Sequence, residues 1–289
     1  MSASYYGQPV IKPPVWTSEV PLYFFTGGLA GASAGLGLLA GLRGDDELAR
    51  RAWGASLAGI AVSPPLLISD LGRPERFLNM LRMLKVTSPM SVGSWVLAAA
   101  SPAVGVAAAN AWTGRFARAA RFARPAAAGL GLPLSTYTAA LLANTSVPVW
   151  HEARGRLPFV FAAGAGAAAG GIGVAVTPVG SASAARRLAV GGAAAELLAI
   201  KVMHRGLGEL GEPYGEGAAG RYARVARLVT GAGAAVVGLG ARRSRAAAVA
   251  GGALVAAGAL AERFSVFHAG RQSAADPKYT IGPQRRRVT

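Results

Sequence analysis

The chain of 289 residues contains no cysteine and only three histidines, His151, His204 and His268. Without cysteine it forms no disulfide, no thiolate zinc site and no cysteine-ligated iron–sulfur cluster. A bundle that holds two haems through paired histidines needs four of them, so a di-haem cytochrome is excluded as well. Any cluster-based electron transfer must therefore involve another chain.

Charged residues are also scarce, at 15% of the sequence, where a soluble domain carries about a quarter. Hydrophobic residues make up 52%. The net charge of +17 would suggest nucleic acid in a soluble protein, but no recognisable nucleic-acid-binding module is present. The arginines cluster instead at the ends of apolar runs, where they meet lipid headgroups. The composition therefore indicates a multi-pass membrane protein in a lipid bilayer, without a nucleic-acid partner.

Long apolar runs without period-two alternation predict spanning helices rather than strands. The runs cover about 20–42, 52–70, 91–113, 125–147, 157–178, 186–208, 222–241 and 245–264. We expect an all-α integral membrane protein with eight transmembrane helices in two four-helix bundles. An even number of spans places both termini on one side. That side carries more Lys and Arg, which predicts cytoplasmic termini.

The connector between the second and third runs contains the segment "PERFLNMLRMLKV", residues 74–86. Its polar residues Arg76, Asn79, Arg82 and Lys85 recur every three positions, and Leu and Phe residues fill the rest. This spacing predicts an amphipathic helix that lies in the membrane interface. The alternative is an ordinary solvated loop.

Several segments carry a resemblance to a known family. They are "YYGQPVIKPPVWTSEVPLYFFTGGLAG" (5–31), "SDLGRPERFLNMLRMLKVTSPMSVGSW" (69–95), "PLSTYTAALLANTSVPVWHEAR" (133–154), "AELLAIKVMHRGLG" (195–208) and "AGRQSAADPKYTIGPQR" (269–285). In this order they resemble the NrfD-type family, the membrane subunit of polysulfide reductase and related molybdoenzyme complexes. The remaining helices are mostly Ala, Gly and Val and add little to the likeness.

The resemblance implies an eight-helix subunit of the prokaryotic cytoplasmic (inner) membrane. Such subunits pass electrons between menaquinone, or another quinone, and a peripheral iron–sulfur subunit with four clusters. That subunit serves a molybdopterin catalytic subunit. The membrane chain holds no haem, cluster or other metal and is non-catalytic alone. We expect residues 1–19 to face the partner, residues 20–264 to form the membrane domain, and the tail 265–289 to contact the partner.

The resemblance also places quinone contacts on Glu19, Tyr23 and Tyr137. Asn144 is a fourth candidate, because it follows Tyr137 by seven residues and so lies on the same helix face. In the family, a Tyr in the segment of Tyr137 hydrogen-bonds a quinone carbonyl, and the start of the first helix lines the pocket. Some members carry a His where Tyr23 aligns. The alternatives are an ordinary buried Tyr, a Glu19 that stabilises a helix N-terminus, and an Asn144 that satisfies backbone groups freed by Pro148.

Six further residues are candidates for proton transfer: Asp70, Arg73, His151, Glu152, Glu196 and Lys201. Ionisable groups in or near spanning segments are costly and so are often functional. Asp70 is a candidate proton acceptor, and a structural salt bridge with Arg73 is the alternative. Lys201 has the alternative of extending its ammonium group to the interface.

Two other functions remain open from the sequence. Buried ionisable groups and glycine-rich helices also occur in transporters and channels, although internal repeats and broken helices in matching positions are not evident. A purely structural membrane anchor without quinone chemistry is the other alternative.

Overall fold

The computed structural model describes residues 9–282, so the outermost parts of the expected N-terminal segment and C-terminal tail lie outside it. The long helices are α1 (Glu19–Leu42), α2 (Asp46–Ser69), α3 (Pro89–Thr113), α4 (Ala117–Ala143), α6 (Leu157–Val176), α7 (Ser183–Leu207), α8 (Gly217–Leu239) and α9 (Arg245–Ala275). The short elements are α5 (Pro148–Glu152), η1 (Pro74–Leu81), η2 (Ala153–Gly155), η3 (Val179–Ser181) and η4 (Gly208–Tyr214). No strand occurs in this range, which confirms the all-α prediction.

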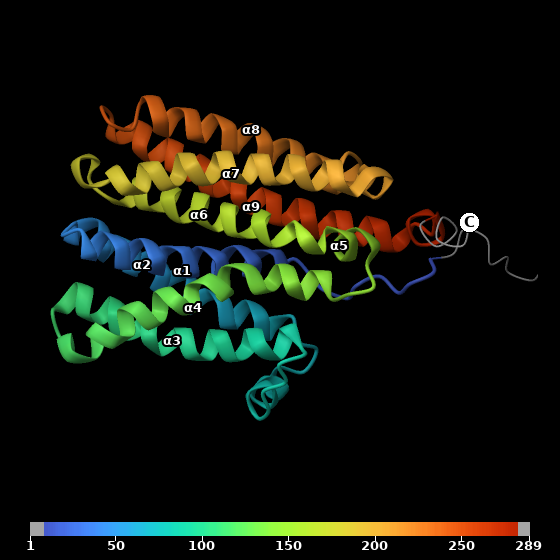
Figure 1. Ribbon diagram of the computed structural model, residues 1–289, viewed down its shortest axis with the longest axis horizontal. Helices are drawn as coiled ribbons and strands as arrows, with labels where there is room; N and C mark the ends of the chain where they lie inside the picture. The colour runs from blue at the N-terminus through green and yellow to red at the C-terminus, as the bar shows by residue number, and fades with distance from the viewer. Residues whose placement is uncertain (1–8, 283–289) are drawn as a thin grey trace, which may run out of the picture.

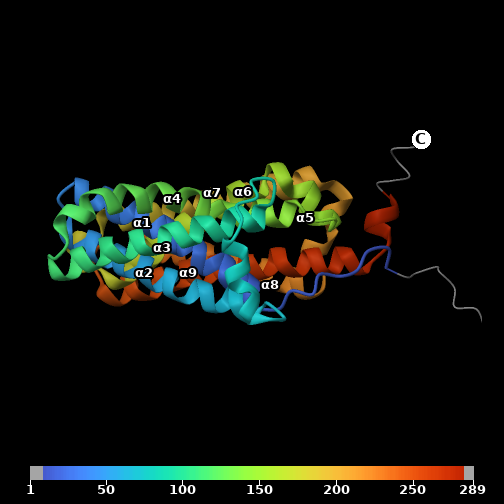
Figure 2. The same cartoon turned by 90° about the horizontal axis from the view of Figure 1, so that it is seen from below.

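The long helices form two groups that lie side by side (Figures 1 and 2). Helices α1 to α4 pack mainly on one another, and α6 to α9 do the same. The seam between the groups is formed by α1 and α4 against α6, with α9 also reaching α1. The chain enters α1 and leaves α9 at the same end of the molecule, which we call the terminal end. The other end is the loop end.

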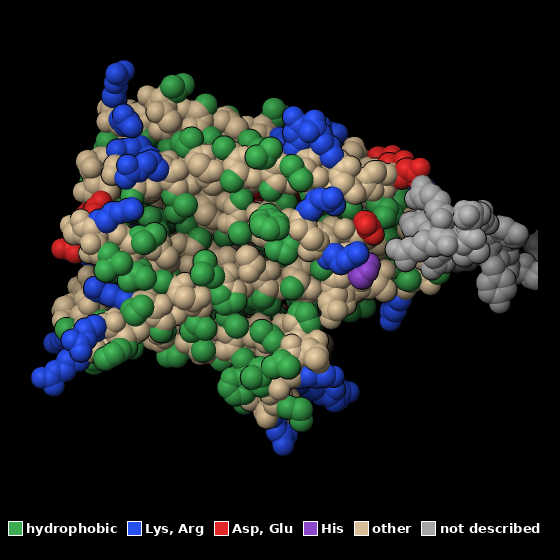
Figure 3. Space-filling view, viewed as in Figure 1, with side chains coloured by type: hydrophobic (Ala, Val, Ile, Leu, Met, Phe, Trp, Pro, Cys, Tyr) green, Lys and Arg blue, Asp and Glu red, His purple; other side chains and the backbone are tan. Residues whose placement is uncertain are grey.

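Six of the described helices are long and apolar enough to cross a membrane: α1, α2, α3, α4, α6 and α9. The other two long helices, α7 and α8, carry charged residues along their length, such as Lys201 and Arg224. Figure 3 shows Lys and Arg gathered near the two ends of the visible face, with a largely uncharged surface between them. The membrane prediction is confirmed, whereas the count of eight spans stays a prediction.

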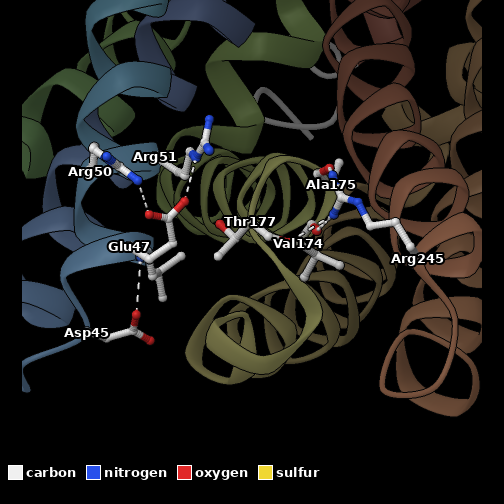
Figure 4. A network of polar contacts seen from close by, with 9 residues as sticks. Asp45, Glu47, Arg50, Arg51, Val174, Ala175, Thr177 and Arg245 are labelled. Carbon is white, nitrogen blue, oxygen red and sulfur yellow. Dashed lines mark hydrogen bonds and ion pairs between the residues drawn. The ribbon is translucent and has the colours of Figure 1, made fainter. Parts of the chain in front are cut away.

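Basic side chains also hold the loop end together (Figure 4). The Arg245 guanidinium donates to the backbone carbonyls of Val174 at 3.3 Å and Thr177 at 2.8 Å, which caps the end of α6. Glu47 forms ion pairs with Arg50 and Arg51 within the first turns of α2. These contacts satisfy charges and helix-end carbonyls where the helices meet the interface.

The connector differs from the expected helix over 74–86. It forms the shorter 3₁₀ helix η1, none of whose residues is buried, and it projects from the first bundle (Figure 1). The last part of the segment is held in a loop by Ser91, whose hydroxyl donates to the Met83 carbonyl at 3.2 Å and accepts from the Lys85 amide at 3.0 Å. The position of η1 in a membrane interface stays a prediction.

Candidate functional site: an apolar pocket at the terminal end of the first bundle

A cavity of about 360 Å³ opens among α1, α2, η1, α3 and α4. Its wall is almost entirely apolar, with side chains such as Val20, Phe24 and Leu67. The polar or amphipathic side chains on it are few: Trp16, Tyr23, Asp70, Arg76, Ser94 and Tyr137. Pockets with apolar walls and a small number of placed polar groups are typical of small-molecule sites.

Two tyrosines meet in the wall of this pocket. The hydroxyl groups of Tyr23 on α1 and Tyr137 on α4 are hydrogen-bonded, and their rings pack edge to face with centroids 6.3 Å apart. Both side chains are buried. One of the two hydroxyl groups donates its proton to this hydrogen bond, so the proton of the other hydroxyl remains available to a ligand oxygen. Gly93 on α3 makes room for the Tyr137 ring, because a Cβ there would collide with it.

Asp70, at the end of α2, is the only acidic residue on the wall. Its Oδ1 accepts two hydrogen bonds from Thr17, one from the backbone amide at 3.0 Å and one from the hydroxyl at 2.8 Å. These bonds tie the segment before α1 to the end of α2, so that Trp16 lies over the pocket. Arg73 is exposed and does not line the cavity; Arg76, from η1, lines it instead.

Trp16 also links the pocket to the second bundle. Its ring stacks on Trp150 of α5 with centroids 5.7 Å apart. The Trp150 indole donates to the Val266 carbonyl of α9 at 2.8 Å and packs against Gly270. The sequence analysis did not single out Trp16 or Arg76, although both lie inside the segments that carry the family resemblance.

The other predicted quinone contacts lie outside the cavity wall. Glu19 begins α1 with a half-buried side chain that accepts from the Ser18 hydroxyl at 3.4 Å. Asn144 is exposed and forms the C-cap of α4, and its backbone amide donates to the Ala140 carbonyl at 3.0 Å. Pro148 begins α5, which fits the expected break in the helix.

Three of the proton-transfer candidates are on the surface. The exposed His151 contacts the Ala143 carbonyl through Nδ1 at 3.0 Å. Glu152 is half-buried and lies 3.8 Å from Arg154. Lys201 is exposed on α7. None of them lines the pocket, and His151 and Glu152 follow α4 at the terminal end.

The candidate Glu196 is different, because it is 1% exposed inside the second bundle. It shares this interior with two residues that the sequence analysis missed, Glu262 at 1% and Arg263 at 2% exposure. The expected end of the eighth helix at 264 made this Glu-Arg pair look like a helix terminus. The apolar residues that follow, such as Val266 and Phe267, were the signal that the helix continues.

Groups of three or more His, Cys, Asp or Glu residues suited to holding a metal do not occur within residues 9–282. The polar groups of the pocket are two phenols, an indole, a serine hydroxyl, one carboxylate and one guanidinium. They are suited to hydrogen bonding and proton exchange with an apolar ring that carries oxygens.

The fold and the pocket define a helical membrane protein with an apolar site near the terminal end of its first bundle. The family model NrfD, described as "Polysulphide reductase, NrfD", matches residues 9–204, which is more than half of the chain. The chain therefore belongs to the NrfD family, whose members are membrane subunits of oxidoreductase complexes of the polysulphide reductase type. No curated protein matches the sequence.

Proposed function

We propose that this chain is the quinone-reactive membrane anchor of a molybdoenzyme-type oxidoreductase complex. It passes electrons between a quinone pool, menaquinone or another quinone, and a peripheral iron–sulfur subunit. The observation that carries the proposal is the apolar pocket with its hydrogen-bonded pair Tyr23 and Tyr137. The NrfD family is associated with quinones in general, which supports the same ligand class.

The residues of the pocket fit a quinone ring. The apolar wall, with Trp16 and Phe24, suits a flat hydrophobic ring, and the tyrosine hydroxyls supply a donor to a ring oxygen. Asp70 supplies an acceptor on the same wall. The site lies at the terminal end, next to the surface where a water-soluble partner would dock.

When bound, a quinol would supply two electrons, which go to the iron–sulfur subunit, and two protons. Tyr137, supported by Tyr23, would orient the ring oxygen and donate or accept its hydrogen bond. Asp70 would take the two protons one after the other and release each toward water at the terminal end. Arg73, His151 and Glu152 lie near that surface and serve as proton-relay candidates, and Glu19 and Asn144 flank the pocket as outer contacts in this proposal.

The partner surface in this proposal is the terminal end. It combines the segment before α1, the connector with η1, the turn after α4 and the end of α9. We propose that the peripheral iron–sulfur subunit docks here and passes electrons to or from a molybdopterin subunit. Residues 1–19 and 265–289 would both contact it, which includes parts outside the described residues.

The test is a Tyr137→Phe variant in the assembled complex. Loss of one hydrogen bond to the ligand is expected to lower quinol-linked electron transfer about tenfold, with unchanged assembly. The matched control is Tyr222→Phe, which alters a partly exposed tyrosine of α8. Unchanged electron transfer and unchanged quinone affinity in Tyr137→Phe would leave only the structural-anchor function.

A further inference from the structure

Three ionisable side chains are buried inside the second bundle, away from the pocket of the first bundle. Glu196 comes from α7, and Glu262 and Arg263 come from α9. Arg263 donates from Nη2 to the Phe161 carbonyl of α6 at 2.8 Å, and its guanidinium lies 4.1 Å from the Phe161 ring centroid. Glu196 Oε1 and Arg263 Nη2 both lie against Gly164, since a Cβ there would collide with each of them.

The charges of this cluster do not balance. Two carboxylates face one guanidinium, so full ionisation would leave a net negative charge in an apolar interior, which is strongly unfavourable. The oxygens Oε1 of Glu196 and of Glu262 have no hydrogen-bond partner within the described part of the chain, and neither do Nε and Nη1 of Arg263. One proton added to the two carboxylates removes the excess charge.

The surrounding elements supply few other titratable groups. From α6 and α1 the neighbours are aromatic, with Phe161 packed on Phe24 at 5.7 Å between centroids. Helix α8 contributes the charge of Arg227, which acts on Glu262. Helix α7 adds His204, and η4 adds Tyr214, whose hydroxyl is close enough to Glu262 for an electrostatic interaction. Arg227 therefore reduces the charge excess, but it remains partly open to solvent and is not the buried partner that Arg263 is.

Tyr214 and His204 lie on the terminal side of this cluster. Their rings are 4.5 Å apart, and the Tyr214 hydroxyl and His204 Nε2 are buried without a hydrogen-bond partner among the residues described. His204 itself is half-buried, so a proton route through the two rings would end near the surface. Hydroxyl and imidazole groups are suited to passing a proton one step at a time.

Toward the loop end the bundle offers no comparable route. The stretches of α6 to α9 on that side contain no Asp, Glu, His, Lys, Arg or Tyr; they are 165–182, 188–195, 228–241 and 246–261. They consist mostly of Ala, Gly, Val and Leu. This half of the bundle therefore lacks titratable side chains that could pass a proton toward the loop end.

We propose that Glu196 and Glu262 share one exchangeable proton beside Arg263, and that this proton exchanges with the terminal side alone, through Tyr214 and His204. The step is a simple protonation: a proton from water at the terminal side joins a carboxylate oxygen and leaves by the same route, with no electron transferred. The second bundle thus holds a one-sided proton site and not a path across the membrane. The proposal is independent of the quinone assignment.

The test is infrared spectroscopy of the purified full-length protein, which reports the C=O stretch of a protonated carboxyl group. Wild type is expected to show one such buried band at neutral pH. Because a single carboxylate beside Arg263 is already neutralised, Glu262→Gln and Glu196→Gln should each abolish the band completely. The matched control Glu212→Gln removes an exposed carboxylate and should leave it. The shared proton would be overturned if wild type showed no such band, or if each Glu variant kept half of the wild-type band intensity.

Arg263→Gln provides a readout that moves in the opposite direction. Without the guanidinium both carboxylates must be neutral, so the band should grow about twofold. A fall or no change would contradict the charge argument, even if the Glu variants fold poorly.

Exchange into D₂O tests the route. Tyr214→Phe should slow the deuterium shift of the band at least several-fold, whereas Tyr222→Phe should leave the rate unchanged. In oriented vesicles a pH step on the terminal side should change the intensity of the carboxyl band, and a step on the loop side should not. Equal response from both sides would overturn the one-sided site.

Discussion

At the scale of single residues, the pocket depends on how the phenol of Tyr137 is held. The ring is fixed on one side by the Tyr23 hydroxyl and on the other by the absence of a side chain at Gly93. A donor that is held in place before the ligand binds loses little freedom on binding. The two contacts therefore matter for orientation rather than for covering apolar area.

Gly93→Ala is expected to move the Tyr137 ring, because the new Cβ would overlap its Cε2 and Cδ2 atoms. Quinol-linked electron transfer should fall about tenfold or more through misplacement of the hydroxyl. Gly105→Ala, in the same helix where the added Cβ meets nothing within 4 Å, is the control. Equal activity in the two variants would show that the orientation of Tyr137 is unimportant.

The hydrogen bonds of Thr17 to Asp70 are observed and proton transfer by Asp70 is proposed, and a pair of variants separates these two roles. Asp70→Asn keeps an acceptor for Thr17 but removes the charge that takes up a proton, so electron transfer should drop about a hundredfold with a changed pH profile. Thr17→Val removes only the 2.8 Å hydroxyl bond that ties the segment before α1 to α2. Should both variants lose the same activity with the same pH profile, Asp70 would be a positioning residue alone.

At the scale of elements, glycines set how closely the helices of each bundle approach. A Cβ at Gly31 of α1 would collide with the carbonyl of Gly131 on α4, and one at Gly170 of α6 would collide with the backbone of Ala189 on α7. Glycines spaced four residues apart, such as Gly27, Gly31 and Gly35 in α1, are typical of close helix packing in membranes. The spacing alone does not distinguish Gly31 from Gly35, where an added Cβ would meet nothing within 4 Å.

Gly31→Val should therefore destabilise the first bundle by about 1–3 kcal/mol, because a branched side chain cannot fit against the α4 backbone. Gly35→Val, one turn along the same helix, faces open space and should change stability far less. Thermal unfolding of the two detergent-solubilised variants gives the comparison. A similar loss in both would point to helix propensity and not to packing.

The limits of the sequence prediction also lie at this scale. Hydropathy found all the long helices but began α2 at residue 52, whereas the helix begins at Asp46 with Asp45 as its N-cap, accepting from the Leu48 amide at 3.1 Å. It ended α9 at 264, before eleven further residues of helix. Charged residues look like water-facing ends in a hydropathy window, and only tertiary packing reveals that Glu262 and Arg263 are inside.

The same reasoning applies to the pocket. Tyr23, Tyr137 and Asp70 could be named from the sequence because they lie in segments with a family likeness. Trp16 lies in such a segment too, but its place over the cavity could not be predicted, because it depends on stacking with Trp150, which is 134 residues away. The hydrogen bonds of Asp70 to Thr17 are likewise a property of the folded arrangement.

At the scale of the whole molecule, functional groups are distributed unevenly between the two ends. The pocket, the ring pair of Tyr214 and His204, and the ends of the described range, residues 9 and 282, all lie at the terminal end, and the loop end carries the contacts of Arg245 and Glu47 (Figures 1 and 4). The bundles meet through the pair Phe24 and Phe161, so the pocket wall and the Arg263 cluster share one aromatic contact. A docked subunit at the terminal end would lie over both.

The contact that holds residues 276–282 at this surface is expected to depend on pH. Lys278 Nζ donates to Glu212 Oε2 at 2.8 Å and Tyr279 donates to the same oxygen at 3.2 Å, and the hydrogen bond from Lys278 lowers the pKa of Glu212. A carboxyl with a lowered pKa in the folded state stabilises it above the ordinary carboxyl pKa. That contribution is lost as the pH falls through the lowered value.

Amide hydrogen exchange of residues 276–282 measures this attachment. The protection factor, which is the intrinsic exchange rate of an unfolded peptide at the same pH divided by the measured rate, should be high at neutral pH and should fall as the pH drops below the ordinary range of a Glu carboxyl. Glu212→Gln should show the lower protection already at neutral pH and lose its pH dependence, while Glu216→Gln, an exposed acid that follows η4, should retain both. A wild-type protection factor that is independent of pH would mean that residues 276–282 are held by the packing of the buried Tyr279 ring and not by the ion pair.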